Sequence, residues 1–273
     1  MTSRPPTTTP HLGHLGLLGA ALLALSAAMP ASAATIILLS DDFSLTRPGG
    51  VTLEPGATID KKAVQNGTGT WARLGDTGGA YFHEDGVIVA TSGNRGGAIA
   101  IPEVTGLTTV QADMQFTATT TGWVAVGFQK SITTGAYGTN NVMGRLTRNG
   151  GWYIYNKGTD GGAIASGTIA GFSTSTVHTL ALQYDPTAGE YGTLSLLVDG
   201  ISPTGASVVL TQAQAFVNPT AATFFLQATG ANARADNFAV LVDIPAIPEP
   251  SALTLTCALG ALALALLNAP RRR

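Results

Sequence analysis

Residues 177–200 read VHTLALQYDPTAGEYGTLSLLVDG, and this stretch decides the fold. Apolar residues occupy every second position in 180–184 and again in 194–198, which is the period of a strand with one buried face. The intervening segment DPTAG, residues 185–189, is typical of a turn, because proline fixes φ and glycine adopts positive φ without strain. The stretch therefore predicts two β-strands joined by a short connection.

The same alternation recurs along the chain. Val110, Ala112, Met114 and Phe116 alternate with polar residues, and the Asn-Gly pair at 149–150 is a hairpin signal. No stretch of the central part has a convincing helical period. Many short strands with turn-rich connections predict a β-sandwich or jelly roll. Further alternating runs stand at 123–129, 143–147, 152–156, 223–227 and 237–242.

Segments 177–185 and 192–200 resemble the paired strands of concanavalin A-like (laminin G-like) lectin sandwiches. The opening segment 41–44, DDFS, and the closing segment 235–238, ADNF, are similar to the first and last strands of such domains. The resemblance covers most of 41–242. It implies an all-β jelly-roll β-sandwich in which the first and last strands are neighbours.

Residues 1–33 have the pattern of a secretory signal peptide. Arg4 gives a weakly positive start, residues 12–28 are mostly apolar, and Ala31, Ser32 and Ala33 fit the small-residue cleavage pattern before Ala34. A permanent N-terminal anchor is the alternative, and it is weaker because the cleavage pattern follows the apolar run directly. We therefore expect signal peptidase to act here and the body to be exported.

A second apolar run, residues 251–268, contains no charged residue. As a helix at about 1.5 Å per residue it would be roughly 27 Å long, just enough for a bilayer core. Arg271, Arg272 and Arg273 follow, and positive residues stay on the cytoplasmic side. A buried core helix is the alternative. The pattern predicts a single C-terminal transmembrane helix that holds the precursor in the inner membrane.

Pro248, Glu249 and Pro250 stand just before this run, and two prolines predict an extended, accessible segment. The Pro-Glu-Pro triplet, the short apolar run and the terminal arginines, in this order, resemble the PEP-CTERM protein-sorting tail. The resemblance implies recognition by an exosortase, a membrane cysteine peptidase/transpeptidase, and removal of the tail at the cell envelope. It also implies a Gram-negative bacterium that makes exopolysaccharide.

These signals divide the chain into a signal peptide (1–33), a β-sandwich body (34–243), a Pro-rich linker (244–250) and a transmembrane tail (251–273). The chain has 14 Lys and Arg against 16 Asp and Glu, so it lacks the charge that nucleic-acid binding needs. The only cysteine, Cys257, falls in the apolar run, so the body has no disulfide. Its stability must come mainly from a hydrophobic core.

The body lacks the residue patterns of familiar hydrolases. Some enzymes of the resembled fold carry Glu-x-Asp-x-Glu on one strand, which aims both glutamates into a cleft, and no glutamate here sits in that pattern. His83, beside Glu84 and Asp85, is expected in a surface turn, with a weak metal site as the alternative. His178 is expected in an edge-polar or packing role at the start of a strand. No Gly-x-Ser-x-Gly elbow occurs. We predict a protein that is not an enzyme, with a glycosidase or lyase using a non-standard acid/base pair as the alternative.

A binding face is predicted from the run 123–129. Its bulky apolar residues, Val124, Val126 and Phe128, alternate with Trp123, Ala125, Gly127 and Gln129. A face with one aromatic ring beside small and polar residues is what an open concave surface would show. Aromatic rings edged with amides suit sugars, which present apolar C–H faces and hydroxyl rims. The alternative is that Trp123 belongs to a core packed under loops. The candidate glycan-binding residues are Trp123, Gln129, Tyr137, Asn140, Asn141, Arg145, Tyr153 and Tyr155.

One metal site is a hypothesis. Asp42 and Asp236 lie on the expected first and last strands, so their carboxylates could share a structural Ca²⁺ that clamps the two ends of the body. The alternative is that both are solvated residues at strand ends.

The function predicted from these patterns is that of an exported, non-catalytic protein of the cell envelope or extracellular matrix. Its expected partners are the signal peptidase, an exosortase and an exopolysaccharide. An ice-binding or adhesin-type surface is a further alternative. Its best segment is TATTT at 117–121, which is too short for a regular Thr-x-Thr array.

Overall fold

The two runs at 177–200 form strands β13 (His178–Asp185) and β14 (Thr193–Val198), which pair antiparallel as predicted, with Leu180 opposite Val198. They belong to an eight-stranded sheet with the order β15-β14-β13-β8-β17-β6-β5, and β1 pairs with β17. The first and last strands are therefore neighbours, which confirms that expectation. The remaining members are β1 (Ala34–Asp41), β5 (Tyr81–Phe82), β6 (Ile88–Ala90), β8 (Thr108–Phe116), β15 (Ser207–Val209) and β17 (Ala233–Ile244).

A seven-stranded sheet with the order β12-β11-β10-β9-β16-β7-β4 faces the first sheet. The predicted hairpin is confirmed, because β10 and β11 pair antiparallel across a turn in which Gly150 has φ 79°. The strands are β4 (Ala72–Gly75), β7 (Gly93–Ala100), β9 (Gly122–Gln129), β10 (Asn141–Thr147), β11 (Gly151–Asn156), β12 (Ala163–Thr168) and β16 (Ala221–Ala228). Smaller elements are β2 (Thr46–Arg47), β3 (Val51–Thr52) and the 3₁₀ helix η2 (Gln212–Gln214).

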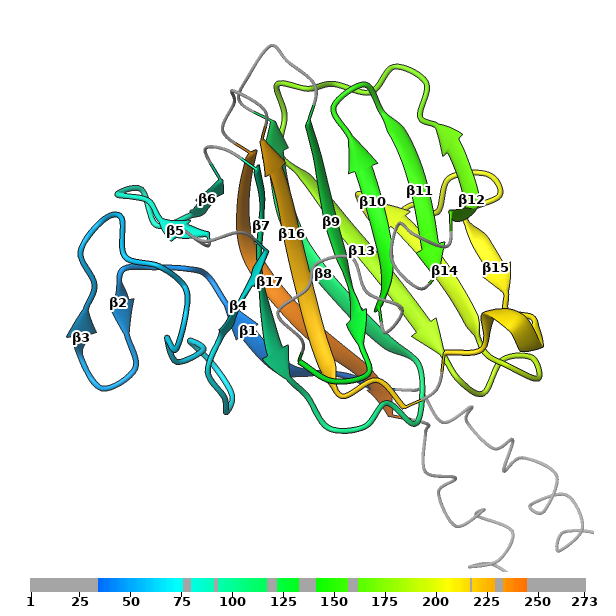
Figure 1. Ribbon diagram of the computed structural model, residues 1–273, viewed down its shortest axis with the longest axis horizontal. Coiled ribbons are helices and arrows are strands. Elements are labelled where there is room, and N and C mark those ends of the chain that lie inside the picture. The colour runs from blue at the N-terminus through cyan, green and yellow to red at the C-terminus, as the bar shows by residue number, and fades with distance from the viewer. Residues whose placement is uncertain are drawn as a thin grey trace, which may run out of the picture. The chain divides into compact units, whose positions relative to one another are not determined.

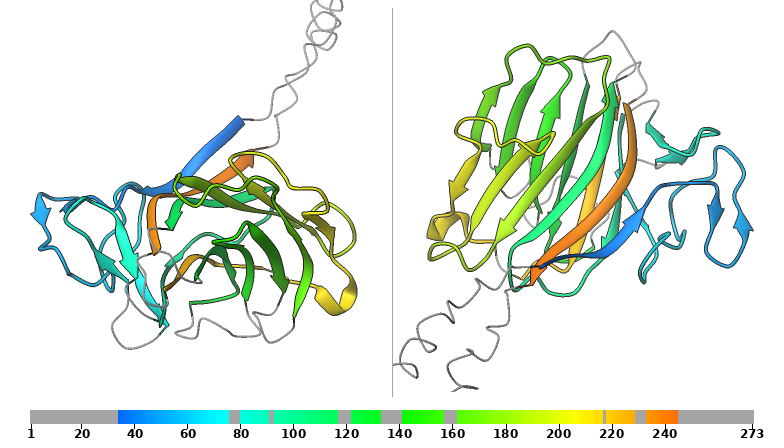
Figure 2. Two further views of the ribbon diagram at one scale, coloured as in Figure 1. Left: turned by 90° about the horizontal axis from the view of Figure 1, so that it is seen from above. Right: turned by 180° about the vertical axis from the view of Figure 1, so that it is seen from behind.

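The structure is a computed structural model that describes residues 34–75, 80–90, 93–116, 122–132, 141–156, 162–216, 218–228 and 233–244. Within it, Thr35–Ile244 forms one compact unit. Figure 1 shows the seven-stranded sheet in front of the eight-stranded sheet, and the view from behind in Figure 2 brings β1, β17, β8 and β13 to the front. The unit is thus an all-β sandwich of two large sheets, the predicted fold class.

The core lies between the two sheets. Strand β8 alternates strictly between buried and half-buried residues, so one of its faces is turned to the core and the other outward. At one end of the core, the ring of Trp71 packs edge-on against Phe224 and Phe238, with centroids 5.4 and 5.0 Å away. Edge-to-face pairs at such distances add to the free energy gained by burial.

A buried ion pair fixes the end of β1 beneath this aromatic group. Asp41 is fully buried, and the Arg47 guanidinium donates to both of its carboxylate oxygens, with Nη1–Oδ1 2.8 Å and Nη2–Oδ2 2.5 Å. The indole N–H of Trp71 also donates to Asp41 Oδ2 at 2.7 Å, and the backbone N–H of Phe43 donates to Oδ1. Four donor contacts satisfy a carboxylate that would otherwise be costly to bury.

Several predictions concern residues outside the described ones. These are the cleavage residues Ala31 and Ala33, the sorting residues Pro248, Glu249 and Pro250, the terminal Arg271, Arg272 and Arg273, and the segment 117–121. Ala34, the expected first residue after cleavage, begins β1. In the part of the chain that the structure describes, no helix is both long and apolar enough to cross a membrane.

Candidate functional site

The predicted binding residues lie on one face of the seven-stranded sheet. Val124, Val126 and Phe128 of β9 belong to the main core, so the alternate residues of β9 point away from the eight-stranded sheet, and we call this the outer face. Trp123 and Ala125 lie there in a second hydrophobic cluster. The register then brings together residues from neighbouring strands: Arg145 of β10 lies opposite Ala125 of β9 and opposite Tyr153 of β11, Met143 lies opposite Tyr155, and Asn141 lies opposite Gln129.

Arg145 is the centre of this arrangement. Its guanidinium carbon lies 4.5 Å from the ring centroid of Tyr153, 4.9 Å from that of Tyr155 and 5.6 Å from that of Trp123. The two tyrosine rings stack on each other, with centroids 5.9 Å apart and planes at 23°. Each of the three contacts between the Arg145 guanidinium and a ring is a cation–π interaction within the usual limit of about 6 Å. We call Trp123, Arg145, Tyr153 and Tyr155 the outer-face cluster.

The members of the outer-face cluster differ in exposure. Tyr153 and Arg145 are half-buried, whereas Trp123 is 7% and Tyr155 8% exposed. Burial raises the pKa of the Tyr155 hydroxyl, Arg145 acts in the opposite direction, and Tyr153 raises the pKa further. A ligand approaching the outer face from solvent therefore meets the Tyr153 ring and the Arg145 guanidinium first.

The prediction that the Trp123 indole is accessible beside small residues is wrong. Trp123 is buried because it packs into the second hydrophobic cluster. Gly127 leaves no room for a ligand either, since a Cβ at this position would lie 2.2 Å from the Val142 carbonyl oxygen. Glycine is needed here for close approach of the β10 backbone. The remaining members of the second hydrophobic cluster are Leu74, Ala98, Ala125, Met143, Tyr155 and Phe225.

Polar side chains lie on the outer face at the other end of β9. Gln129 and Thr223 are fully buried, and the amide atoms of Gln129 and the hydroxyl of Thr223 have no hydrogen-bond partner among the residues that the structure describes. Asn141 lies beside Gln129 in the register and is also buried. Because buried polar atoms in proteins are nearly always hydrogen-bonded, the Gln129 and Thr223 atoms without a partner in this part of the chain are unusual. Together with Asn141 they make this end of the outer face polar. The predicted Tyr137 and Asn140 are outside the described residues.

Carboxylates are unevenly distributed between the two sheets. The described strands of the seven-stranded sheet contain no aspartate or glutamate, whereas Asp41, Asp113, Asp185, Asp236 and Asp243 lie on strands of the eight-stranded sheet. A retaining glycosidase needs two carboxyl groups about 5 Å apart beside the bound sugar. The described strands of the outer face cannot supply such a pair.

In the acidic turn at His83–Asp85, the side chains of His83 and Asp85 are engaged with each other. The His83 ring nitrogen Nδ1 lies 2.5 Å from Asp85 Oδ1, and Arg234 donates to Asp85 Oδ2 at 2.6 Å. Burial raises the pKa of Asp85, but its contacts with His83 and Arg234 outweigh burial, so the pKa lies below its ordinary value. Asp85 therefore stays ionised near neutral pH and is a poor general acid.

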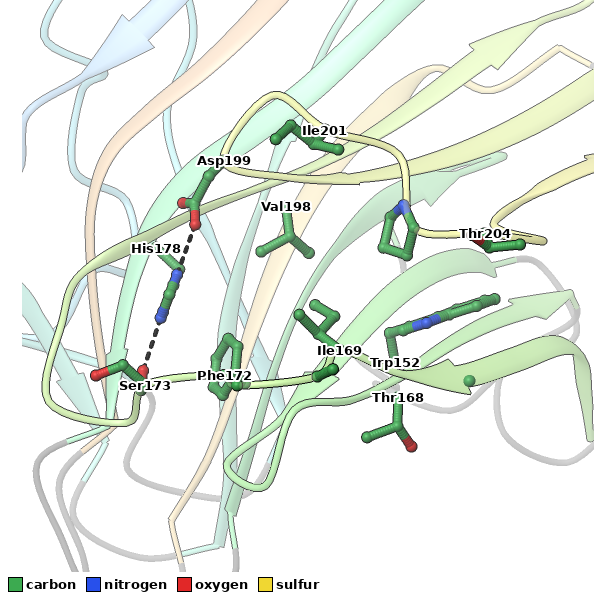
Figure 3. A pocket seen from close by; sticks show the side chains of 14 residues that line it. Trp152, Thr168, Ile169, Phe172, Ser173, His178, Val198, Asp199, Ile201 and Thr204 are labelled. Atoms are coloured by element: carbon green, nitrogen blue, oxygen red, sulfur yellow. Dashed lines mark hydrogen bonds and ion pairs between the residues drawn. The ribbon is translucent and has the colours of Figure 1, made fainter.

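A cavity formed by the described residues was not foreseen from the sequence. It holds about 580 Å³, which is in the range of small-molecule sites, and combines Trp152 of β11 with Val198 of β14 (Figure 3). His178 Nδ1 lies 2.7 Å from Asp199 Oδ2 at one end of it. The further lining residues that Figure 3 labels are Thr168, Ile169, Phe172, Ser173, Ile201 and Thr204.

Ser173, His178 and Asp199 superficially suggest a catalytic triad, but the geometry does not fit one. His178 Nε2 lies 2.7 Å from the backbone carbonyl of Ser173, while the Ser173 hydroxyl lies 3.1 Å from that of Ser175. Asp199 Oδ1 accepts from the backbone N–H of Thr179. The imidazole also stacks on Phe172 at 4.3 Å between centroids. These groups fix a turn, and the predicted packing role for His178 agrees with this geometry.

The expected calcium pair lies in an electronegative region. Burial raises the pKa of Asp236 above 3.8, the backbone N–H of Asn237 lowers it, and the carboxylates of Asp113, Asp42 and Asp41 raise it further. Asp42 and Asp236 thus interact, as expected for neighbouring first and last strands. Among the residues that the structure describes, however, no group of three or more His, Cys, Asp or Glu could hold a metal ion.

Comparisons with known proteins show similarity in fold alone. No family model matches the chain, and no curated protein matches it in sequence. Among solved structures, the Emp46p carbohydrate recognition domain in its potassium-bound form has a TM-score of 0.44 at 16% identity, covering 62% of this chain and 87% of that one. The carbohydrate-binding module CBM66 from Bacillus subtilis has a TM-score of 0.44 at 12% identity, covering 62% and 94%.

A β-1,3-glucanase from Mycobacterium marinum has a TM-score of 0.45 at 15% identity and covers 75% of this chain and 98% of that one. The chain is thus similar both to carbohydrate-binding domains and to glycan-cleaving enzymes. It resembles the galectin-like and concanavalin A-like sandwiches, and function must be argued from its own residues.

Proposed function

We propose that the body is a non-catalytic carbohydrate-binding domain and that a saccharide binds on the outer face at Tyr153 and Arg145. The observation that carries the proposal is the stacked pair of Tyr153 and Tyr155 with a guanidinium against both rings. Tyr153 and Arg145 are the half-buried members of this group, on a stretch of described strands with no other charge on the outer face. The flat ring of Tyr153 suits the apolar C–H face of a pyranose, and the guanidinium N–H groups suit its oxygens.

The non-catalytic part of the proposal is supported by the distribution of carboxylates. The described strands on this side of the sandwich bear none, and Asp85 is engaged by His83 and Arg234. A sugar held on the outer face would therefore have no acid/base pair from these strands beside its glycosidic bond.

The binding test uses the full chain, purified in detergent, against immobilised polysaccharides that include the exopolysaccharide of the producing cell. Tyr153→Ala should abolish retention, because it removes the accessible ring of the outer-face cluster. Tyr191→Ala, which removes a half-buried tyrosine paired with Glu190 elsewhere, is the matched control. Equal retention of the Tyr153→Ala variant would contradict the proposed site. Release of soluble sugars from the polysaccharides would contradict the non-catalytic assignment.

We also propose that the protein is exported and sorted at a Gram-negative cell envelope by an exosortase. The support is in the sequence: the cleavage pattern before Ala34, the triplet 248–250 and the terminal arginines. Cells that lack the exosortase should accumulate the uncleaved precursor in the inner membrane. A Glu249→Ala chain should show the same accumulation in exosortase-positive cells. Normal processing of both would contradict the sorting proposal.

We also propose a structural Ca²⁺ that bridges Asp42 and Asp236. It is supported by the pKa of Asp236, which burial raises first and which repulsion from Asp113, Asp42 and Asp41 raises further. Such a cation would relieve that repulsion. Added CaCl₂ should raise the melting temperature, and EDTA should reverse the increase. A melting temperature that responds to neither would end this proposal.

A further inference from the structure

We infer that the outer face selects acidic saccharides and that Arg145 pairs with the carboxylate of a uronic acid residue. The inference rests on the proposed function, since it names the class of sugar that the same site takes. It is carried by two independent observations, the charges of the sheet and the surroundings of Arg145.

Among its described strands, the outer face carries a positive charge without a compensating negative one. Of the arginines on the seven-stranded sheet, Arg73 lies opposite Gly97, and a Cβ at Gly97 would meet Trp71 and Ile59 of the core. Arg95 and Gly97 are two positions apart on β7, so their side chains point to the same face. Arg73 and Arg95 therefore both lie on the inner side of the sheet. Arg145 is thus the arginine that projects from the outer face among the described strands, on a sheet without carboxylates.

The surroundings of Arg145 suit the binding of an anion, because they fix its guanidinium and leave its charge unpaired among the described residues. The rings of Tyr153, Tyr155 and Trp123 fix its guanidinium, so little side-chain entropy remains to be lost on binding. Its Nε atom is buried without a hydrogen-bond partner among the described residues, and they include no carboxylate that forms an ion pair with it. A planar carboxylate matches the arginine fork with two parallel hydrogen bonds.

The position of Tyr153 links charge recognition with sugar recognition. Tyr153 lies opposite Arg145 in the strand register, and its ring centroid is 4.5 Å from the guanidinium carbon. A pyranose stacked on the half-exposed Tyr153 ring therefore brings a substituent at its edge within reach of Arg145. In a hexuronic acid that substituent is a carboxylate, whereas in a neutral hexose it is a hydroxymethyl group. The difference of one full charge decides selectivity at this contact.

The alternative is that Arg145 only packs between aromatic rings and stabilises the sheet. A packing role predicts that loss of Arg145 lowers the melting temperature and weakens the binding of acidic and neutral sugars alike. A receptor role predicts that the loss weakens the binding of the acidic sugar far more than that of the neutral sugar.

The experiment compares matched ligands and matched variants of the full chain in detergent. The ligands are alginate and polygalacturonate tetramers, each beside its carboxyl-reduced counterpart, which keeps linkage and stereochemistry but is neutral. The variants are Arg145→Gln, which removes the charge, and Arg145→Lys, which keeps the charge without the fork. Arg73→Gln is the control, because it removes the charge of an arginine on the same sheet that does not lie on the outer face.

For the unmodified chain we expect the Kd of at least one acidic tetramer to be about tenfold or more below that of its reduced counterpart, as for a charge-assisted pair. Arg145→Gln should remove this difference, because it weakens the binding of the acidic tetramer far more than that of the reduced tetramer, which loses only neutral hydrogen bonds to the guanidinium. Arg145→Lys should restore part of it, and Arg73→Gln should have no effect. The preference should also weaken as NaCl is added, because salt screens the exposed ion pair.

Equal affinity of the unmodified chain for acidic and reduced tetramers would overturn the acidic specificity while leaving saccharide binding intact. A uniform loss of affinity in Arg145→Gln would overturn the receptor role in favour of packing. Absence of binding to all tetramers and to the exopolysaccharide would overturn the proposed function itself.

Discussion

Asp41 has a carboxylate whose described contacts all lie within the core. Its carboxylate is fully buried and takes hydrogen bonds from Arg47, Trp71 and Phe43. The sequence drew attention to the acidic pair at 41–42 as a strand signature and, at Asp42, as a candidate ligand. The structure separates the two roles, because Asp41 is buried in an ion pair and Asp42 is exposed.

We expect Asp41→Ala to lower the free energy of unfolding by about 3–5 kcal/mol, because it leaves the Arg47 guanidinium buried and uncompensated. Urea denaturation of the variant and of the unmodified chain measures the difference. Asp42→Ala removes the neighbouring exposed carboxylate and should cost less than about 1 kcal/mol. Similar losses in the two variants would show that the buried pair contributes little.

Asp236 gives a prediction with a pH dependence. Its raised pKa means that the folded state binds this proton more tightly than the unfolded state does, so stability is lost as the pH rises from 3.8 through the raised pKa. Asp236→Asn removes the charge and should therefore raise the melting temperature at pH 7. The difference should vanish well below pH 3.8. Glu54→Gln, at an exposed site, is the control. A lower melting temperature of Asp236→Asn at pH 7 without added metal would contradict the prediction.

At the scale of elements, strands were predicted where alternation is strong, and β8, β9, β10, β11, β13, β14, β16 and β17 all contain predicted runs. Strand β7, with the sequence GNRGGAIA, was missed because glycine disfavours strands. Its glycines have a packing reason that only the neighbouring elements reveal. A Cβ at Gly96 would lie 2.2 Å from the Phe224 carbonyl oxygen, and one at Gly97 would lie 2.8 Å from the Trp71 ring.

Gly96→Ala in β7 should lower the free energy of unfolding by about 1–3 kcal/mol, because the added methyl group meets backbone that cannot move aside. Thermal denaturation followed by circular dichroism measures this. Gly106→Ala is the control, since its Cβ would meet only the Asp243 carbonyl oxygen at 3.8 Å, and it should change stability by less than about 0.5 kcal/mol. A Gly96→Ala chain as stable as the unmodified one would show that β7 has room to shift.

Part of the candidate site could be predicted from the alternation of side chains along the strands. Because side chains alternate along a strand, the run 123–129 placed Trp123 and Gln129 on one face, as the structure has them. Tyr153 and Tyr155, named as candidates from the sequence, lie opposite Arg145 and Met143 on the same face. The sequence left open whether Trp123 is accessible or part of a core, because its burial depends on Phe225 and Leu74 from strands distant in sequence. The cation–π contacts of Arg145 likewise require the register of three strands.

At the scale of the whole molecule, the two sheets differ in charge. The eight-stranded sheet carries the strand carboxylates, including the group around Asp236, and the seven-stranded sheet carries only arginines among its charged strand residues in the described part. A sandwich with one acidic and one basic sheet can present unlike faces to an anionic matrix. This asymmetry was not visible before the strands were assigned to their sheets.

The chain contains three tryptophans, and each occupies a different environment. Trp71 is in the core with its N–H on Asp41, Trp123 lies beside the Arg145 guanidinium, and Trp152 lines the cavity of Figure 3. Their fluorescence is therefore a set of three local reporters. Emission from Trp123 would respond to a ligand on the outer face, emission from Trp152 to one in the cavity, and emission from Trp71 to unfolding. Variants that keep a single indole would show by spectroscopy which part of the molecule a sugar reaches.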